Sequence, residues 1–169
     1  KIFKKLQDKY KNTKKINLFK CAISNKNGKK NLKINIKSST SSFSYYNKDS
    51  KWRKLKEFLL NGFGKSSFVN LEKVNTITLD KFCKKNKISK IDLLKIDTEG
   101  HEREVLEGGK KVLKNKTEYV LIEFHLSKIY QNYNFQKIDK ILKNKKFKLI
   151  KKFKFPFLAF EDRIYKKIN

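Results

Sequence analysis

The chain has 169 residues, of which 38% are hydrophobic, so its length and apolar content suit one domain with a buried core. No apolar run is long enough to cross a bilayer, which excludes a membrane span in this sequence, and its start carries no signal-peptide pattern. The formal net charge is +28. This charge needs an explanation before any function is assigned.

Such a charge is typical of proteins that bind nucleic acid or another anionic surface. A biased composition is the alternative, because Lys far outnumbers Arg and because Asn, Ile, Phe and Tyr are also abundant. Proteins that bind phosphates and bases favour the bidentate fork of Arg, and here the lysines are spread along the whole chain. We favour the compositional origin and expect only weak, salt-sensitive, non-specific attraction to polyanions.

Two further features concern the chain's compartment and its start. Cys21 and Cys83 form no metal-binding or redox motif, so we expect two reduced, partly buried thiols, which suits a cytoplasmic protein. The sequence begins at Lys1 and contains no Met. We therefore expect it to start inside a longer reading frame, with trimming as the alternative.

The first half of the chain predicts a series of short elements. We expect a helix over residues 1–11, strands over 16–23 and 31–36, a helix over 51–60, a loop over 61–67 and a strand within 69–79. Residues 24–28 form a turn. The serine-rich segment 38–44 is either a solvated linker or a mobile cover over a ligand site. Asp80 begins a short helix that continues to Asn86, and we expect it to cap the amino end of that helix.

Residues 90–102, KIDLLKIDTEGHE, organise the rest of the chain. Residues 91–96 are predicted to form a strand buried on both faces, and polar residues follow it abruptly from Asp97. Gly100 permits a tight turn with positive φ, and a helical pattern comes next. Gly108 and Gly109 lie inside that pattern, which indicates either a close approach of helix to sheet or a break in the helix.

A second apolar segment, YVLIEFH at residues 119–125, also ends in polar groups. Glu123 and His125 lie two positions apart and therefore share one face of the strand. We expect a helix over residues 135–144, then two strands, 147–153 and 158–165, as an antiparallel hairpin around Pro156. The alternation of strands and helices predicts an α/β fold with a mostly parallel sheet, helices on both faces and the hairpin at one edge.

The carboxyl ends of parallel strands are where such sheets bind ligands. We therefore expect Asp97, Glu99, His101, Glu123 and His125 to gather around one crevice, since buried carboxylates are costly unless they are used or paired. Two alternatives remain open. The five residues can form a hydrogen-bonded network that only stiffens the strand ends, or they can hold a divalent metal. The spacing fixes no metal geometry, so we assign no metal ligands.

The stretches IDLLKIDTEGHEREVLEGGKKVL and YVLIEFH resemble the FkbM family of S-adenosylmethionine-dependent methyltransferases. The family pattern is a strand ending in K-I-D-x-E-G-x-E, then x-V-L-x-G, then a strand ending in I-E-x-H. INLFKCAISNKNG, the serine-rich loop and TITLDKF are similar to other family segments in the same order. The resemblance covers most of residues 1–165 and implies a Rossmann-like class I methyltransferase fold.

One departure from the family concerns the amino-terminal end. The family begins with a strand and a glycine-rich turn that cradle the cofactor, followed by a second strand that ends in an acidic residue. Neither is present here, so we expect residues 1–169 to be a single, partial methyltransferase domain that lacks the amino-terminal strands and half of the cofactor site.

The resemblance implies methyl transfer from S-adenosylmethionine to a hydroxyl oxygen of a sugar, glycan-like or lipid-linked acceptor. Asp97 is our first choice as the base or as a group that orients the acceptor, and His101 has a suitable intrinsic pKa for a base. Glu99 and Glu123 are expected to hold acceptor hydroxyls, with His125 orienting Glu123 or Asp97. Ala22 is expected to approach the adenine of the cofactor, with Ser24 beside it.

Smaller roles and alternative functions complete the hypothesis. Lys95 shares the side of Asp97 by alternation and is expected to be its ion-pair partner, while Glu102 favours the amino end of the helix through the helix dipole. The alternatives to an enzyme are a basic nucleic-acid-binding α/β module and an inactive partial gene product. The sequence indicates neither the acceptor nor the oligomeric state.

Overall fold

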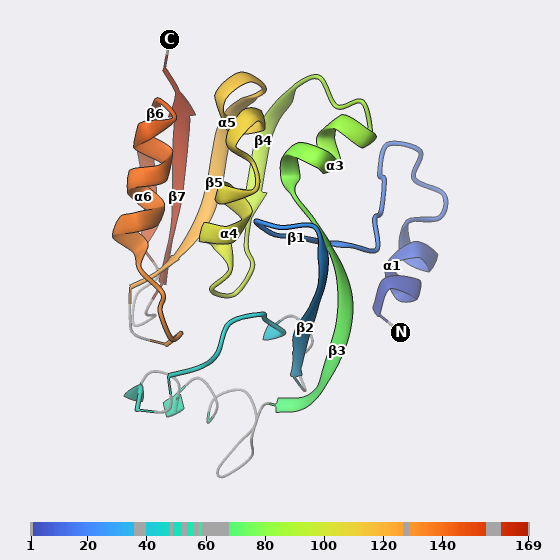
Figure 1. The fold of residues 1–169 in the computed structure, drawn as a ribbon, viewed down its shortest axis with the longest axis vertical. Coiled ribbons are helices and arrows are strands. Elements are labelled where there is room, and N and C mark those ends of the chain that lie inside the picture. Colours follow the sequence, from blue (N-terminus) through green and yellow to red (C-terminus); the bar gives the residue numbers. More distant parts are fainter. Residues whose placement is uncertain are drawn as a thin grey trace.

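The computed structural model describes residues 2–35, 40–47, 49–51, 54–55, 58, 68–126, 129–154 and 160–168. These residues form an α/β fold with two mixed sheets, whose strand orders are β1-β3-β2 and β4-β5-β7-β6 (Figure 1). The predicted helix over 51–60 lies largely outside the described residues, as does the predicted loop over 61–67. No described helix is long and apolar enough to span a membrane.

The first sheet is built around β3 (Phe68–Ile77), which pairs antiparallel with β2 (Gly28–Asn35) and parallel with β1 (Ala22–Ile23). The predicted strand over 16–23 is therefore wrong for residues 16–21, since only two of its residues pair. The second predicted strand is confirmed as β2, and its partner is β3.

The second sheet contains the organising segment as β4 (Ile91–Ile96), which pairs in parallel with β5 (Thr117–His125). Two short helices, α4 (Glu102–Glu107) and α5 (Lys110–Asn115), connect these strands. β6 (Phe147–Lys154) and β7 (Phe160–Lys167) form the predicted antiparallel pair. The prediction of a mostly parallel sheet is wrong for the described strands, because β7 runs antiparallel between β5 and β6.

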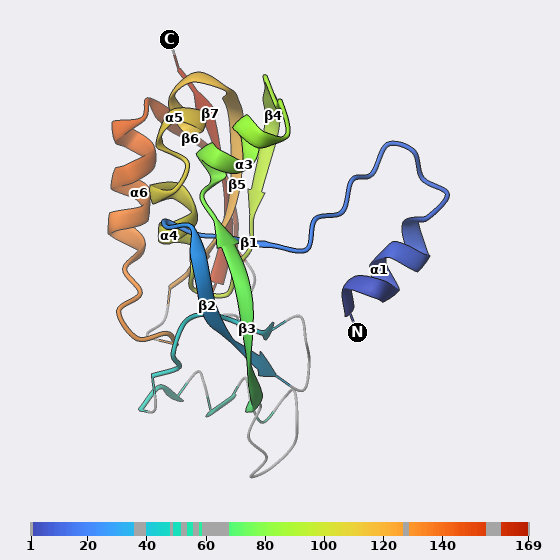
Figure 2. The ribbon, with the colours of Figure 1, turned by 45° about the vertical axis from the view of Figure 1, so that its right-hand side comes forward.

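The helices of the second sheet cover one of its faces. In Figures 1 and 2, α4, α5 and α6 (Phe135–Asn144) lie on the same side of strands β4 to β7. Their apolar stripes pack against alternate strand residues to form the main core: Ile96, Val105, Leu106, Leu113, Val120, Ile122, Phe124, Ile138, Leu142, Phe147 and Tyr165. Burying these side chains is the main source of stability for this half of the molecule.

The opposite face of this sheet is not covered by a described helix. Leu121 and Ile164 are only partly buried there, and Leu93 and Phe153 are 54% and 40% exposed. Helices on both faces were predicted, and so was burial of β4 on both faces. Both predictions are wrong for the described residues, since β4 is an edge strand of a sheet with one helical layer.

Two outer helices differ in how they meet the rest of the chain. The predicted first helix is confirmed as α1 (Ile2–Tyr10), which lies apart from the two sheets (Figure 2). The helix α3 (Leu79–Lys85) is also confirmed, but Thr78 caps it by accepting from Lys81 N. The prediction that Asp80 caps α3 is wrong. Its carboxylate instead accepts hydrogen bonds from the backbone N–H groups of Lys111 and Val112 at the start of α5.

The two adjacent glycines divide the helical segment after β4. The helix stops at Glu107 and resumes at Lys110, and a Cβ atom on Gly108 would lie 2.1 Å from the carbonyl oxygen of Ser24. The two predicted alternatives, a close approach of helix to sheet and a break in the helix, are therefore both confirmed, because the chain approaches the end of β1 at the point where the helix breaks. Of the two cysteines, Cys83 is buried as expected and Cys21 is exposed; neither forms a disulfide.

Candidate functional site

A cavity of about 340 Å³ lies beside the carboxyl end of β4. It is bounded by the end of β4, by β1 and by residues 41–43 of the serine-rich loop, and it has a largely apolar wall. The side chains that line it are Cys21, Ala22, Ile23, Leu32, Ser41, Ser42, Phe43, Leu79, Leu94, Lys95, Ile96, Asp97, Thr98, His101 and Val105. Three of the predicted site residues, Ala22, Asp97 and His101, thus share one cavity.

Asp97 lies at the tip of β4 with its side chain 44% exposed. Lys95 Nζ donates to its Oδ2 over 3.1 Å, as the alternation of the strand predicted. This hydrogen bond, together with the negative charges of Asp97, Asp162 and Glu123, raises the pKa of Lys95. Asp97 is therefore an accessible carboxylate with one exposed ammonium partner.

Asp97 and Glu123 lie on the same face of the sheet. Ile96 pairs with Ile122 in the parallel register, so the residues that follow them point to the same side. Glu123 in turn pairs with Asp162 on β7. Burial raises the pKa of Asp162, and the nearby charge of Asp97 adds to this effect. Three carboxylates therefore form an acidic row across the carboxyl end of β4 and β5.

Glu99 occupies a left-handed position in the turn after β4, with φ 52°, and Gly100 follows with φ 93°. The hydroxyl of Tyr130 donates to the Glu99 carboxylate. The Tyr130 ring also covers Gly100, where a Cβ atom would lie 2.7 Å from its Cγ. The turn thus needs glycine at this position both for its backbone conformation and for the packing of the tyrosine.

His101 is 2% exposed and lies in the wall of the cavity. Its Nε2 is 3.0 Å from Ser24 Oγ, and its Nδ1 is 3.5 Å from Glu104 Oε2. Burial lowers the pKa of His101 to about 4, against the attraction of the Glu104 carboxylate. The imidazole is therefore neutral at pH 7, and it ties the end of β1 to the start of α4.

The described part of the serine-rich loop, residues 40–44, lies over the turn after β4. Ser42 Oγ donates to the carbonyl oxygen of Glu99 over 2.5 Å, and Ser44 Oγ donates to that of Gly100 over 2.7 Å. Between them, the Phe43 ring lies 4.9 Å from the His101 ring. This arrangement favours the cover over the solvated linker.

His125 and Glu123 are in contact, as their spacing suggested. Nε2 of His125 lies 3.3 Å from Glu123 Oε1, and the backbone N–H of His125 donates to the Tyr133 hydroxyl over 3.1 Å. The buried imidazole also packs edge-on against the rings of Tyr130 and Tyr133. His125 is thus held firmly beside Glu123, which suits an orienting residue.

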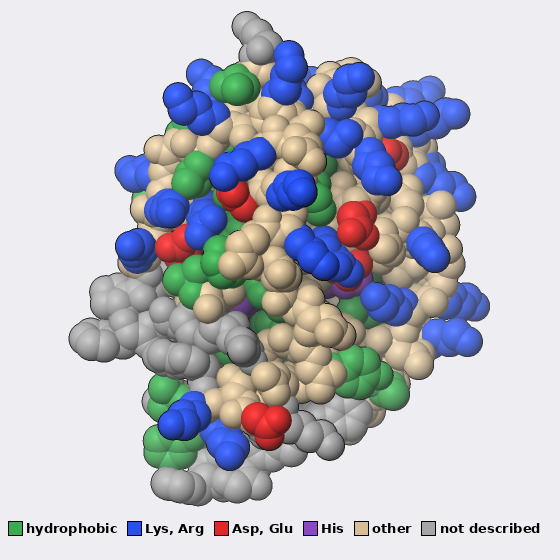
Figure 3. Space-filling model, turned by 60° about the vertical axis from the view of Figure 1, so that its left-hand side comes forward, with side chains coloured by type: hydrophobic (Ala, Val, Ile, Leu, Met, Phe, Trp, Pro, Cys, Tyr) green, Lys and Arg blue, Asp and Glu red, His purple; other side chains and the backbone are tan. Residues whose placement is uncertain are grey.

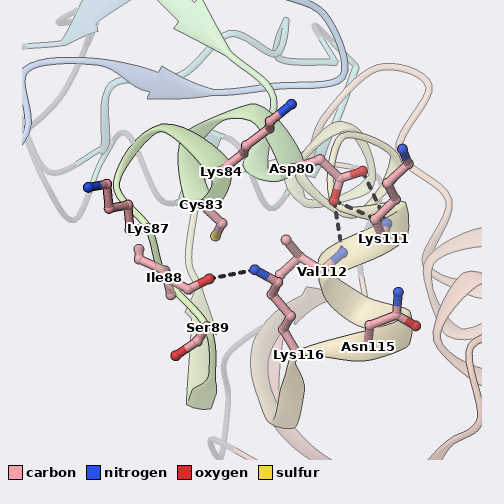
Figure 4. A pocket seen from close by; sticks show the side chains of 10 residues that line it. All are labelled: Asp80, Cys83, Lys84, Lys87, Ile88, Ser89, Lys111, Val112, Asn115 and Lys116. Carbon is pink, nitrogen blue, oxygen red and sulfur yellow. Dashed lines mark hydrogen bonds between the residues drawn. The ribbon is translucent and has the colours of Figure 1, made fainter.

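A second cavity, of about 420 Å³, lies between α3 and α5 and contains none of the predicted site residues (Figure 4). The Lys84 and Lys87 ammonium groups extend away from it. Lys116 Nζ donates a hydrogen bond to the carbonyl oxygen of Ile88 over 2.6 Å. We therefore interpret this cavity as a gap in the packing of two helices and not as a candidate site.

The metal alternative finds no support in the described part of the chain. No three His, Cys, Asp or Glu side chains among the described residues come together in a way that could hold a metal ion. Lys and Arg side chains are scattered over much of the described part of the face in Figure 3 and do not gather into one block there.

Three residues that help to form the candidate site were not predicted as site residues from the sequence. Asp162 joins the acidic row only because β7 inserts beside β5, and Tyr130 meets Glu99 from a segment 31 residues away. Glu102 was assigned to the helix dipole but is fully buried and accepts hydrogen bonds from the turn. Only Glu102 carried a sequence signal, since its position two residues after Gly100 matches the acidic end of the D-x-E-G-x-E pattern.

Comparisons with known proteins were made at three levels. No curated protein and no solved structure matches the chain significantly. A family model, described as the methyltransferase FkbM domain, matches residues 2–149 and so covers most of the chain. With the mixed α/β sheets and the polar strand ends described above, this match shows that the chain belongs to the FkbM methyltransferase family.

Proposed function

We propose that the chain is part of an S-adenosylmethionine-dependent methyltransferase that acts on a hydroxyl group of a sugar, glycan-like or lipid-linked acceptor. The observation that carries this proposal is the cavity beside β4, where Asp97 lies against an apolar wall and on the same face as Glu123. We also propose that the pair β4 and β5, with its connecting helices, belongs to a Rossmann-like class I fold.

The residues of the cavity fit part of the cofactor. Ala22, Ile23 and Leu79 provide an apolar surface of the kind that an adenine ring requires. Ser24 follows β1 and lies within hydrogen-bond distance of His101 in the cavity wall. A cavity of 340 Å³ lies within the size range of small-molecule sites, about 300–1,000 Å³. S-adenosylmethionine, when bound, supplies an electrophilic methyl group.

The protein's part in the reaction is to hold and deprotonate the acceptor. Asp97 orients the acceptor hydroxyl and accepts its proton, since it is the exposed carboxylate at the cavity. Orienting two reactants in this way can contribute about 7–11 kcal/mol to lowering a barrier in favourable cases. Glu99 and Glu123 accept hydrogen bonds from further acceptor hydroxyls, and His125 fixes the Glu123 carboxylate.

His101 has a supporting role in this scheme. Its Nε2 faces Ser24 and its ring is nearly inaccessible, so it is less available than Asp97 to take a proton from an acceptor. As a neutral imidazole it can still act as a base if the Ser24 contact opens. We propose that it first of all holds Ser24 and the floor of the cavity in place.

Transfer of a labelled methyl group from S-adenosylmethionine to a panel of sugars and glycolipids tests the function. Asp97→Asn is expected to lose turnover while it stays folded by circular dichroism. The matched control is Asp92→Asn, on the same strand and 79% exposed, which is expected to keep full activity. The protein assayed is the full-length one, and a full-length protein that binds no cofactor and transfers no methyl group to any acceptor would contradict the proposed function.

A further inference from the structure

The turn between β4 and α4, residues 97–101, determines where Asp97, Glu99 and His101 lie. Two successive residues of this turn have positive φ, and one of them, Glu99, is not glycine. A left-handed conformation at such a residue is unfavourable and persists only where the surroundings impose it. The groups that impose this conformation on Glu99 therefore also fix the shape of the site.

Glu102 holds the turn from the inside. Its side chain is fully buried, and its Oε1 accepts three hydrogen bonds: from Thr98 N at 3.0 Å, Thr98 Oγ1 at 3.0 Å and Gly100 N at 3.1 Å. The two backbone donors flank Glu99 on either side. One carboxylate oxygen thus holds the backbone N–H groups of the two residues that flank the left-handed residue.

Burial of the Glu102 carboxyl costs free energy, and packing alone does not offset this cost. No ion pair to Glu102 is present in the described part of the chain, and its Oε2 has no hydrogen-bond partner there. Burial raises the pKa of this carboxyl, against the effect of the donors. A buried carboxyl without a cation is normally unfavourable, so its presence beside the site calls for a role other than packing.

The outer side of the turn is held by other groups. Ser42 and Ser44 donate to the carbonyl oxygens of Glu99 and Gly100, and Tyr130 donates to the Glu99 carboxylate. The inward N–H groups of Thr98 and Gly100 depend on Glu102 instead. Removing Glu102 therefore leaves these two donors without partners while the outer contacts remain.

We propose that Glu102 is a positioning residue that fixes the 97–101 turn and thereby sets the orientation of Asp97 toward the cavity. The proposal rests on the function proposed above, because it takes Asp97 as the group that meets the acceptor. It does not place Glu102 in contact with acceptor or cofactor.

The test compares Glu102→Ala, Glu102→Gln and the exposed control Glu118→Ala by NMR and by kinetics. In Glu102→Ala, amide exchange at Thr98 and Gly100 is expected to rise at least tenfold. The kcat is expected to fall at least tenfold with KM changed less than threefold. Glu102→Gln is expected to restore both the amide exchange and the kcat, because its amide oxygen can accept the same hydrogen bonds.

Two results would overturn the proposal. One is unchanged amide exchange at Thr98 and Gly100 in Glu102→Ala. The other is an equal rise in exchange at core amides such as that of Ile122, which would mean a general loss of stability. If Glu102→Ala does not fold, Thr98→Val removes one of the three donors and is expected to shift the same readouts by a smaller amount. The NMR readouts do not require methyl transfer. A full-length protein in which Glu102 protects the amides of Thr98 and Gly100 but which transfers no methyl group would therefore contradict the proposed function and leave the role of Glu102 standing.

Discussion

At the scale of single residues, His101 combines near-complete burial with a titratable ring. Its neutral form is the one that fits between Ser24 Oγ and the Glu104 carboxylate, and burial holds its pKa at about 4. In an unfolded chain a histidine takes up a proton near pH 6.5. Between these two values the unfolded state binds more protons than the native state, so stability must fall as the pH falls.

We predict that the free energy of unfolding decreases by about 2–3 kcal/mol between pH 7 and pH 4.5 through His101 alone. The measurement is denaturant unfolding at both pH values for the wild type and for His101→Gln, which removes the titration and keeps a polar partner for Ser24. The difference between the two proteins isolates His101 from the carboxyl groups that titrate in the same range. Identical pH dependence in both proteins would contradict the assigned burial.

Some features of the residues could be predicted from the sequence and others could not. Strand alternation was enough to place Lys95 beside Asp97 and Glu123 beside His125. The burial of His101 depends on Ser24, which is 77 positions away, and the role of Asp80 depends on the start of α5. Local patterns carry no information about such distant partners.

At the scale of elements, the serine-rich loop is the part most directly connected to function. Ser42 and Ser44 attach it to the turn after β4, and Phe43 lines the cavity between them. The two serine side chains therefore hold a cover over the candidate site. Each such hydrogen bond contributes about 0.5–1.5 kcal/mol.

We predict that the double variant Ser42→Ala, Ser44→Ala loosens this cover without unfolding the protein. Proteolysis of the loop is expected to become faster, and S-adenosylmethionine is expected to dissociate more quickly in stopped-flow measurements. Ser89→Ala, an exposed serine that lines the cavity between α3 and α5, serves as the control. An unchanged dissociation rate would mean that the loop is only a linker.

Elements with strong local signals were predicted with the correct bounds. The helix over 135–144 is an example, because its apolar periodicity is clear and Asn134 caps its amino end by accepting from Lys137 N. The strand over 16–23 was overextended, since its apolar residues meet no partner strand before Ala22. The position of β7 between β5 and β6 depends on non-local pairing, so the hairpin was predicted but its inner strand was not.

At the scale of the whole molecule, the four-stranded sheet has one helical layer and one face without a described helix. Leu93 and Phe153 are exposed on this second face, whereas Leu106, on the helical side, is completely buried. The two faces should therefore respond very differently to substitution. The alternation of burial along β5 and β7 supports this division.

We predict that Leu93→Lys and Phe153→Lys each change the free energy of unfolding by at most about 0.5 kcal/mol, as is usual for surface positions. Leu106→Ala is expected to cost about 2–5 kcal/mol, because it leaves a cavity in the core. Urea unfolding of the three variants is the measurement. A cost for Leu93→Lys comparable with that of Leu106→Ala would show that another part of the chain covers this face.

The overall architecture was predictable only in part. The alternation of strands and helices correctly indicated an α/β fold. Of the two polar strand ends, the end of β4 lines the cavity in which we propose the site. The number of helical layers was not predictable, because half-buried apolar residues such as Leu121 and Ile164 look the same in sequence whether or not a helix covers them.

The central claim is that methyl transfer takes place at the carboxyl end of β4, with Asp97 as the group that meets the acceptor hydroxyl. The most direct test is the rate of labelled methyl transfer by the full-length wild type and by its Asp97→Asn and Asp92→Asn variants under identical conditions. We predict a loss of at least about 100-fold for Asp97→Asn, as for removal of a general base, and no loss for Asp92→Asn. A folded Asp97→Asn variant that retains a near-normal rate would contradict the account.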